Sequence, residues 1–113
     1  METSDKTARI RELNNELRHT MDSRYGDVML TKGVLALGQP AVGEALEQVK
    51  KFREFTEDND PHGEHDCACF KVHATDLMWK IDYYDNALTW GSPDPSDPAV
   101  TRRVLTILLV EEY

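Results

Sequence analysis

Hydrophobic residues recur at helical spacing in two stretches of the chain. Between about Thr7 and Thr20 they occupy positions 10, 13, 17 and 21, with arginine, glutamate and asparagine between them. From about Pro40 to Phe55 they occupy positions 42, 45, 46, 49 and 52, directly after a helix-start signal at Gly38 and Pro40. Because residues three and four apart lie on one side of a helix, both stretches predict amphipathic helices.

Short strands are predicted between and after these helices. Residues 28–31 favour a strand, with a turn or bulge at Lys32 and Gly33, and their pattern leaves open whether residues 34–37 continue it or form a helical turn. Residues 67–72 and 77–84 alternate with a period of two, and the turn at 73–76 joins them into a β-hairpin. The second hairpin strand would carry Leu77, Trp79, Ile81 and Tyr83 on one face and Met78, Lys80, Asp82 and Tyr84 on the other.

The end of the chain predicts a third helix. Asp97 is suited to the N-cap and Pro98 to the first helical position. One stripe of this helix would carry Val100, Val104, Ile107, Leu108 and Glu111. The predicted order is therefore α-β-α-β-β-α. We expect an α+β fold in one small domain, residues 1–113, with a small antiparallel sheet whose hairpin is packed by helices.

Charge narrows the classes of partner. The chain has 113 residues and a net charge of −8, which disfavours direct binding to nucleic acid or to an anionic membrane. No apolar run approaches the roughly 20 residues of a membrane span, and the N-terminus lacks a secretory signal. The two cysteines, Cys67 and Cys69, are too far apart on one strand for a disulfide, so reduced thiols and a cytoplasmic location are expected.

Residues 55–66, which we call the acidic segment, concentrate the unusual chemistry. Within residues 57–66 lie five carboxylates and two histidines, with no lysine or arginine. Carboxylates this close repel one another unless a bound cation, a basic partner or water with dissolved salt compensates their negative charge. A metal site would use Asp58, Asp60, His62, Glu64 and His65.

Two familiar metal motifs fit this segment poorly. The opening of the segment resembles a calcium loop, but Cys69 stands where such a loop has glutamate, and Pro61 lies inside it. A zinc set of His65, Cys67 and Cys69 with His62 would be too widely spaced along one strand, and no Cys-x-x-Cys pair is present. Two small core-facing thiols beside a polar loop are the more ordinary interpretation.

The sequence favours binding over catalysis. It has no glycine-flanked nucleophile, phosphate-cradling loop or His-Glu-x-x-His pattern, so it favours a non-enzymatic protein and predicts no cofactor. Four of its aromatic residues fall within residues 79–90, and Tyr84 and Trp90 lie off the expected core face, as anchors for a basic partner would. The candidate binding surface consists of Glu57, Asp58, Asp60, Glu64, Asp66, Asp82, Tyr84, Asp85 and Trp90.

Three blocks of the chain, residues 55–66, 79–85 and 94–107, resemble the bacterial family catalogued as domain of unknown function 3768. The resemblance implies a short protein of the kind common in alphaproteobacteria and on mobile elements, and it carries no assigned activity. Its polar signature also includes Lys80, Asp82, Arg102 and Arg103. These residues are candidates for the internal partners that hold the acidic segment in place.

These observations lead to two functional hypotheses. The first is a small acidic interaction module, a mobile-element regulator or inhibitor that binds a basic protein surface, such as that of a nucleic-acid-binding enzyme. It would act as an anti-defence protein or as a mimic of nucleic acid. The alternative is a metal-binding or metal-dependent hydrolytic protein that uses the histidine-containing acidic segment. The pattern predicts no oligomeric state.

Overall fold

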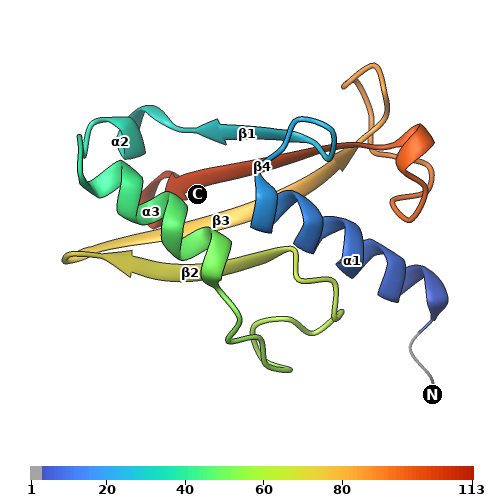
Figure 1. The fold of residues 1–113 in the computed structure, drawn as a ribbon, viewed down its shortest axis with the longest axis horizontal. Coiled ribbons are helices and arrows are strands. Elements are labelled where there is room, and N and C mark those ends of the chain that lie inside the picture. Colours follow the sequence, from blue (N-terminus) through green and yellow to red (C-terminus); the bar gives the residue numbers. More distant parts are fainter. Residues whose placement is uncertain (1–3) are drawn as a thin grey trace.

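A four-stranded sheet covered on one face by two helices forms the body of the protein (Figure 1). The computed structural model describes residues 4–113. Its helices are α1 (Asp5–Thr20), α2 (Lys32–Leu35) and α3 (Ala41–Lys51), and its strands are β1 (Asp27–Leu30), β2 (Cys67–Val72), β3 (Thr75–Tyr84) and β4 (Arg102–Leu109). Two 3₁₀ turns, η1 (Pro98–Val100) and η2 (Val110–Glu112), flank β4. The predicted α+β class is confirmed.

The sheet has the order β1-β4-β3-β2 and is mixed. The hairpin of β2 and β3 is antiparallel, as the sequence predicted. The pair of β3 and β4 is also antiparallel, but the sequence did not predict it because β4 was expected to be a helix. However, β1 runs parallel to β4, so the expectation of a purely antiparallel sheet was wrong. A parallel neighbour requires a long crossover, and here it consists of α2, α3 and the hairpin.

The last element corrects the sequence prediction most clearly. Asp97 does cap a helical start, accepting the N–H of Ala99, but η1 ends at Val100 and residues 102–109 form strand β4 rather than a helix. Arg103, Leu105 and Ile107 are buried at alternate positions. The β-branched residues of this segment favour that period of two, so Val100, Val104, Ile107, Leu108 and Glu111 share no helical stripe.

The other elements lie close to their predicted positions. Of residues 34–37, whose pattern was ambiguous, the first two end the short helix α2 and the last two form the turn after it. Helix α3 ends at Lys51, before the predicted end at Phe55. The hairpin turn has two residues, His73 and Ala74, rather than four, because β3 begins at Thr75.

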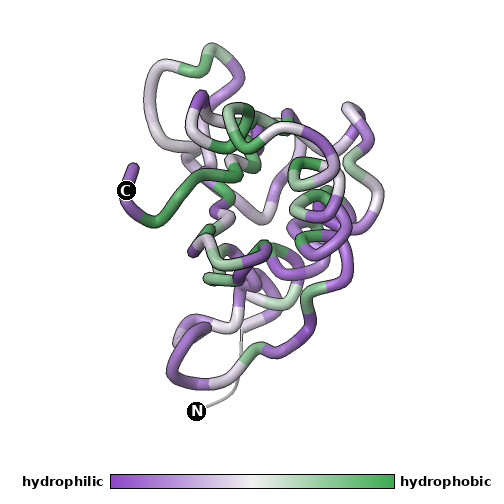
Figure 2. The backbone as a smooth tube through the Cα atoms, turned by 90° about the vertical axis from the view of Figure 1, so that its left-hand side faces the viewer, coloured by the Kyte–Doolittle hydropathy of each residue, from purple (hydrophilic) through white to green (hydrophobic). Residues whose placement is uncertain are grey.

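The core lies between the sheet and the pair α1 and α3. Leu77, Trp79 and Ile81 of β3 point into it, as their alternation predicted, and pack with Leu105 and Ile107 of β4. The helices contribute these buried residues: Leu17, Val42, Ala45 and Val49. Turned by 90°, the chain shows the helical coils gathered on one side of the strands (Figure 2). The opposite face of the sheet, which we call the open face, is not covered by α1 or α3.

Candidate functional site

The acidic segment lies against α1 rather than extending freely into solvent. The Arg11 guanidinium donates to the carbonyl oxygen of Gly63 (2.8 Å), and the Asn14 amide donates to that of Glu64 (3.0 Å). One turn along, Asn15 Oδ1 lies 3.1 Å from His65 Nδ1. Gly63 and His65 both have positive φ, which turns their backbone toward the helix. Polar residues of α1 therefore fix the path of the segment.

His65 forms the inner end of this contact. Its backbone N–H donates to Asp60 Oδ1 (3.1 Å), and its ring stacks on Phe55 with centroids 3.8 Å apart. Burial lowers the pKa of His65, and the nearby charges of Arg11 and Arg18 act in the same direction, while Asp60 opposes them. A histidine with a lowered pKa is mostly neutral at pH 7, so His65 serves here as a packed, hydrogen-bonding ring.

A second group of hydrogen bonds ties the segment to the sheet. The Tyr83 hydroxyl donates to Glu64 Oε1 (2.7 Å) and accepts from the Asn14 amide (2.8 Å). Arg103 Nε donates to Asn14 Oδ1 (2.7 Å), and its guanidinium lies over the Tyr83 ring. Burial, followed by the bond to Glu64, raises the pKa of Tyr83, so the hydroxyl stays protonated and keeps donating. We call Asn14, Glu64, Tyr83 and Arg103 the polar network.

Arg18 is the buried cation of this region. It donates to the carbonyl oxygens of Val49 (2.9 Å) and Phe52 (2.6 Å), where α3 ends, and its guanidinium lies over the rings of Phe55 and Trp79. Burial lowers its pKa to about 10, which leaves it charged at pH 7. A positive charge at a helix C-terminus is favourable, so Arg18 joins α1, α3 and the start of the acidic segment.

The positive partners suggested by the family signature are mostly engaged elsewhere. Lys80 pairs with Asp82 on the open face, and Arg102 pairs with Asp27 of β1 (2.6 Å). Arg103 alone of the three reaches the segment, through Asn14. The sequence analysis missed Arg11 and Arg18, although their spacing with Asn14 and Asn15 on a predicted helix marks one polar stripe.

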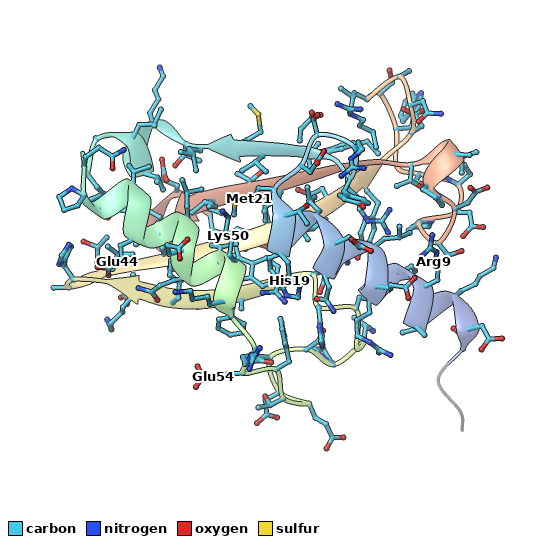
Figure 3. All side chains as sticks on the ribbon, in the orientation of Figure 1. Arg9, His19, Met21, Glu44, Lys50 and Glu54 are labelled. Atoms are coloured by element: carbon cyan, nitrogen blue, oxygen red, sulfur yellow. The ribbon has the colours of Figure 1, made fainter. Side chains whose placement is uncertain are left out.

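The carboxylates of the acidic segment fall into two groups. Asp60 is buried and Glu64 is half-buried, and both accept hydrogen bonds from residues of the protein. Asp66 is half-buried, and burial, then the charge of Glu64, raises its pKa. Glu57 and Asp58 are exposed and make no hydrogen bond or ion pair with residues 4–113. Glu54, just before the segment, also points away from the body of the protein (Figure 3).

The proposed metal ligands do not converge. Asp60 and His65 lie together, with Asp60 Oδ2 3.6 Å from His65 Nε2. Glu64 turns instead toward Tyr83, and Asp58 and His62 are exposed. Across residues 4–113, no three His, Cys, Asp or Glu side chains form a group that could hold a metal ion. The zinc set of His62, His65, Cys67 and Cys69 is not assembled either, and both thiols are free.

The remaining candidate binding residues lie around the end of β3. Asp82 and Tyr84 face the open side of the sheet, and residues 85–91, which we call the Trp90 loop, follow. Asp85 holds this loop through four hydrogen bonds. Its N–H donates to Trp90 O (2.8 Å) and its carbonyl accepts from Leu88 N (2.9 Å), while its carboxylate accepts from Thr89 N (3.0 Å) and Trp90 N (3.4 Å). The loop presents Leu88, 52% exposed, and Trp90, 74% exposed.

The described helices do not include one that is long and apolar enough to cross a membrane.

Fold and site together define a small α+β protein whose acidic segment is held by a helix and whose hairpin exit presents a tryptophan. The chain belongs to the family described as protein of unknown function DUF3768, whose model matches residues 30–112. The match covers the acidic segment, Tyr83 and Arg103, while the α1 residues that hold the segment precede it. Neither the curated proteins nor the solved structures gave a match.

Proposed function

We propose that this protein is a non-enzymatic interaction module that inserts Trp90 into a pocket on a partner protein. The observation that carries the proposal is an indole 74% exposed at the closing end of a loop whose backbone is already hydrogen-bonded. A large aromatic side chain on an ordered turn loses little conformational entropy on binding, and tryptophan is among the residues that dominate interface energies. Leu88 beside it adds apolar area.

The charge of the protein supports a basic partner. The net charge is −8, and Glu57 and Asp58 remain solvated because no residue of the described chain pairs with them. Such charges steer a positively charged surface toward the protein and raise the association rate more than the final affinity. A protein that binds nucleic acid has such a surface. We propose a cytoplasmic regulator or inhibitor of this kind of partner, encoded by a mobile element.

The internal hydrogen bonds of the titratable residues in the acidic segment favour a binding role over catalysis. Among the titratable residues of the segment, His65, Asp60 and Glu64 each already have an internal partner. A general base must instead reach a substrate proton from an accessible position. The same residues serve better as a rigid support for the exposed carboxylates.

Affinity capture from the host organism tests the proposal. The wild-type protein, Trp90→Ala and Tyr113→Ala would be immobilised and washed at low and high salt, with quantitative mass spectrometry of the retained proteins. Tyr113 is the matched control, because it is an aromatic residue 83% exposed that lies outside the Trp90 loop. We expect a basic protein that the wild type and Tyr113→Ala retain, that Trp90→Ala loses, and that salt weakens. Equal retention by all three variants contradicts the role of Trp90.

A further inference from the structure

Three sulfur-containing side chains lie together on the open face of the sheet. Ala68 and Val72 of β2 point into the core, so Cys67 and Cys69 project from the opposite face. Met78 of β3 projects from the same face, because its neighbours Leu77 and Trp79 are buried. In the register of the hairpin, Met78 lies directly opposite Cys69.

The hydrogen-bond pattern brings this cross-strand pair close. Ile81 N–H donates to Asp66 O (2.7 Å), which makes residues 66 and 81 a hydrogen-bonded pair. Pairs alternate along an antiparallel ladder, so Cys69 and Met78, three steps along, form a non-hydrogen-bonded pair. The Cα atoms of such a pair are about 4.5 Å apart and their side chains approach more closely than in the other kind of pair.

The spacing of the two thiols suits a shared metal ion better than a disulfide. Residues two apart on a strand have Cα atoms about 6.5–7 Å apart, at or beyond the limit for a disulfide. A metal–sulfur bond of about 2.3 Å allows two ligating sulfurs to remain roughly 4 Å apart. Two thiolates that cannot join each other can therefore still bind one ion, with the Met78 thioether as a third ligand.

We propose that Cys67, Cys69 and Met78 form a binding site for a soft monovalent metal ion, Cu(I). Thiolate and thioether sulfur are the ligands that select Cu(I), whereas structural zinc requires four ligands that usually include more cysteine or histidine. The site differs from the zinc set considered above because it uses no residue of the acidic segment and draws one ligand from β3. This inference is independent of the proposed function, since Trp90 takes no part in it.

The surroundings of the site allow an ion to enter. Cys69 is exposed, and β2 is an edge strand, so the thiols are accessible from solvent. Lys80, the residue opposite Cys67, has its ammonium group paired with Asp82, and Lys71, two residues after Cys69 on the same face, is paired with Asp76. Both lysine charges beside the thiols are thus already offset by carboxylates.

Anaerobic titration of the reduced protein with Cu(I), in competition with a chromophoric Cu(I) chelator, tests the site. We expect one equivalent to bind with a near-ultraviolet sulfur-to-copper band. Cys67→Ser and Cys69→Ser should each weaken the affinity on the order of 100-fold, and Met78→Leu on the order of 10-fold. Met29→Leu is the matched control, because Met29 is an exposed methionine of the same face at the far strand β1, and it should bind as the wild type does.

Two further measurements keep the test decisive. Circular dichroism and thermal unfolding without metal should coincide for all variants, which separates loss of a ligand from loss of the fold. Zn(II) in the same competition should bind at least about 100-fold more weakly than Cu(I). The site is overturned if the wild type takes up no Cu(I), if Zn(II) binds as tightly, or if any of the three ligand variants keeps full affinity.

Discussion

The acidic segment and the Trp90 loop use their side chains in opposite ways. In the acidic segment, backbone carbonyls, one histidine and two carboxylates turn inward to α1 and to the polar network. In the Trp90 loop, the internal hydrogen bonds come from Asp85 and the backbone, while Trp90 and Leu88 point outward. The acidic segment, which has the highest density of charged residues, thus serves mainly to support the fold. The Trp90 loop, with its two exposed apolar side chains, is the better candidate for binding.

This difference teaches that clustered carboxylates need not form a site. The nearest positive charges to the acidic segment are Arg11, Arg18 and Arg103, and they bond mainly to backbone carbonyls and to asparagine. Neutral groups therefore mediate between the charges. Such a network allows carboxylates to be partly buried without close ion pairs. It depends on every member, because losing one leaves a buried polar group without a partner.

The largest expected effect is the loss of Arg103. Its side chain is 3% exposed and bonds to Asn14, so Arg103→Ala leaves the buried Asn14 oxygen without a donor and removes the packing on Tyr83. We expect a loss of about 2–4 kcal/mol in the free energy of unfolding, measured with urea. Arg102→Ala is the neighbouring control, and its solvated pair with Asp27 should contribute little. If both substitutions lower the free energy of unfolding by the same amount, the polar network does not stabilise the fold.

A smaller effect is expected from the hydroxyl of Tyr83. Tyr83→Phe keeps the ring and removes the group that links Asn14 to Glu64, so we expect a loss of about 1–2 kcal/mol in unfolding free energy. Hydrogen exchange at residues 63–65 should also accelerate. Tyr84→Phe changes a hydroxyl that bonds to no residue of the described chain and should leave both readouts unchanged. If Tyr83→Phe and Tyr84→Phe have the same unfolding free energy and exchange rates, the Tyr83 hydroxyl does not hold the acidic segment.

Asp66 provides a pH-dependent test of the acidic segment. Because its folded pKa is raised, mainly by burial, the folded state binds more protons than the unfolded state between the unfolded pKa of about 3.9 and the folded pKa. The free energy of unfolding therefore falls as the pH rises through that window, because the folded protein must release this proton. Asp66→Asn should be more stable than the wild type at pH 7 and equal to it below pH about 3.5. Asp58→Asn, at an exposed position, should raise the free energy of unfolding at pH 7 only slightly. If it raises it as much as Asp66→Asn does, the destabilisation by Asp66 is not caused by its burial.

The smallest effect on stability is expected at Trp90. Its side chain makes little contact with the body of the protein, so Trp90→Ala should change the free energy of unfolding by less than about 0.5 kcal/mol. Thermal and urea unfolding would measure it. A loss of more than about 1 kcal/mol would show that the indole packs on the protein and is not presented to a partner.

The sequence predicted the elements whose hydrophobic residues recur with a clear helical or strand spacing. It missed strand β4, which follows a helix-capping signal. The apolar positions of α1, α3 and β3 identified their buried faces correctly, down to Leu77, Trp79 and Ile81. The expectation that Cys67 and Cys69 face the core was wrong, because Ala68 and Val72 take the core face of β2. At the end of the chain, the cap at Asp97 was real but stabilises only the turn η1. The run from Val104 to Leu109 is apolar at every position except Thr106, so helix and strand patterns both fit it. Its pairing with β1 and β3, which local sequence does not encode, decides the outcome.

The candidate site was predictable only in outline. The pattern located the acidic segment between the second helix and the hairpin, and it identified Trp90 as lying off the core face. It did not reveal that Arg11, Asn14, Asn15 and Arg18 face the segment, because contacts between residues about 50 positions apart depend on how α1 packs on the sheet. Nor did it show that Asp60 and Glu64 point inward while Glu57 and Asp58 do not.

Hydrogen exchange of individual amides in the acidic segment tests the central claim most directly. The amides of Asp60, Gly63 and His65 donate within the segment, whereas those of Glu57 and Asp58 do not bond to residues 4–113. If the segment is held by α1 and the polar network, the first three amides should exchange at least about tenfold more slowly than the other two, after correction for intrinsic rates. If all five exchange at the rate of an unstructured peptide, the acidic segment is a free charged loop and the account is wrong.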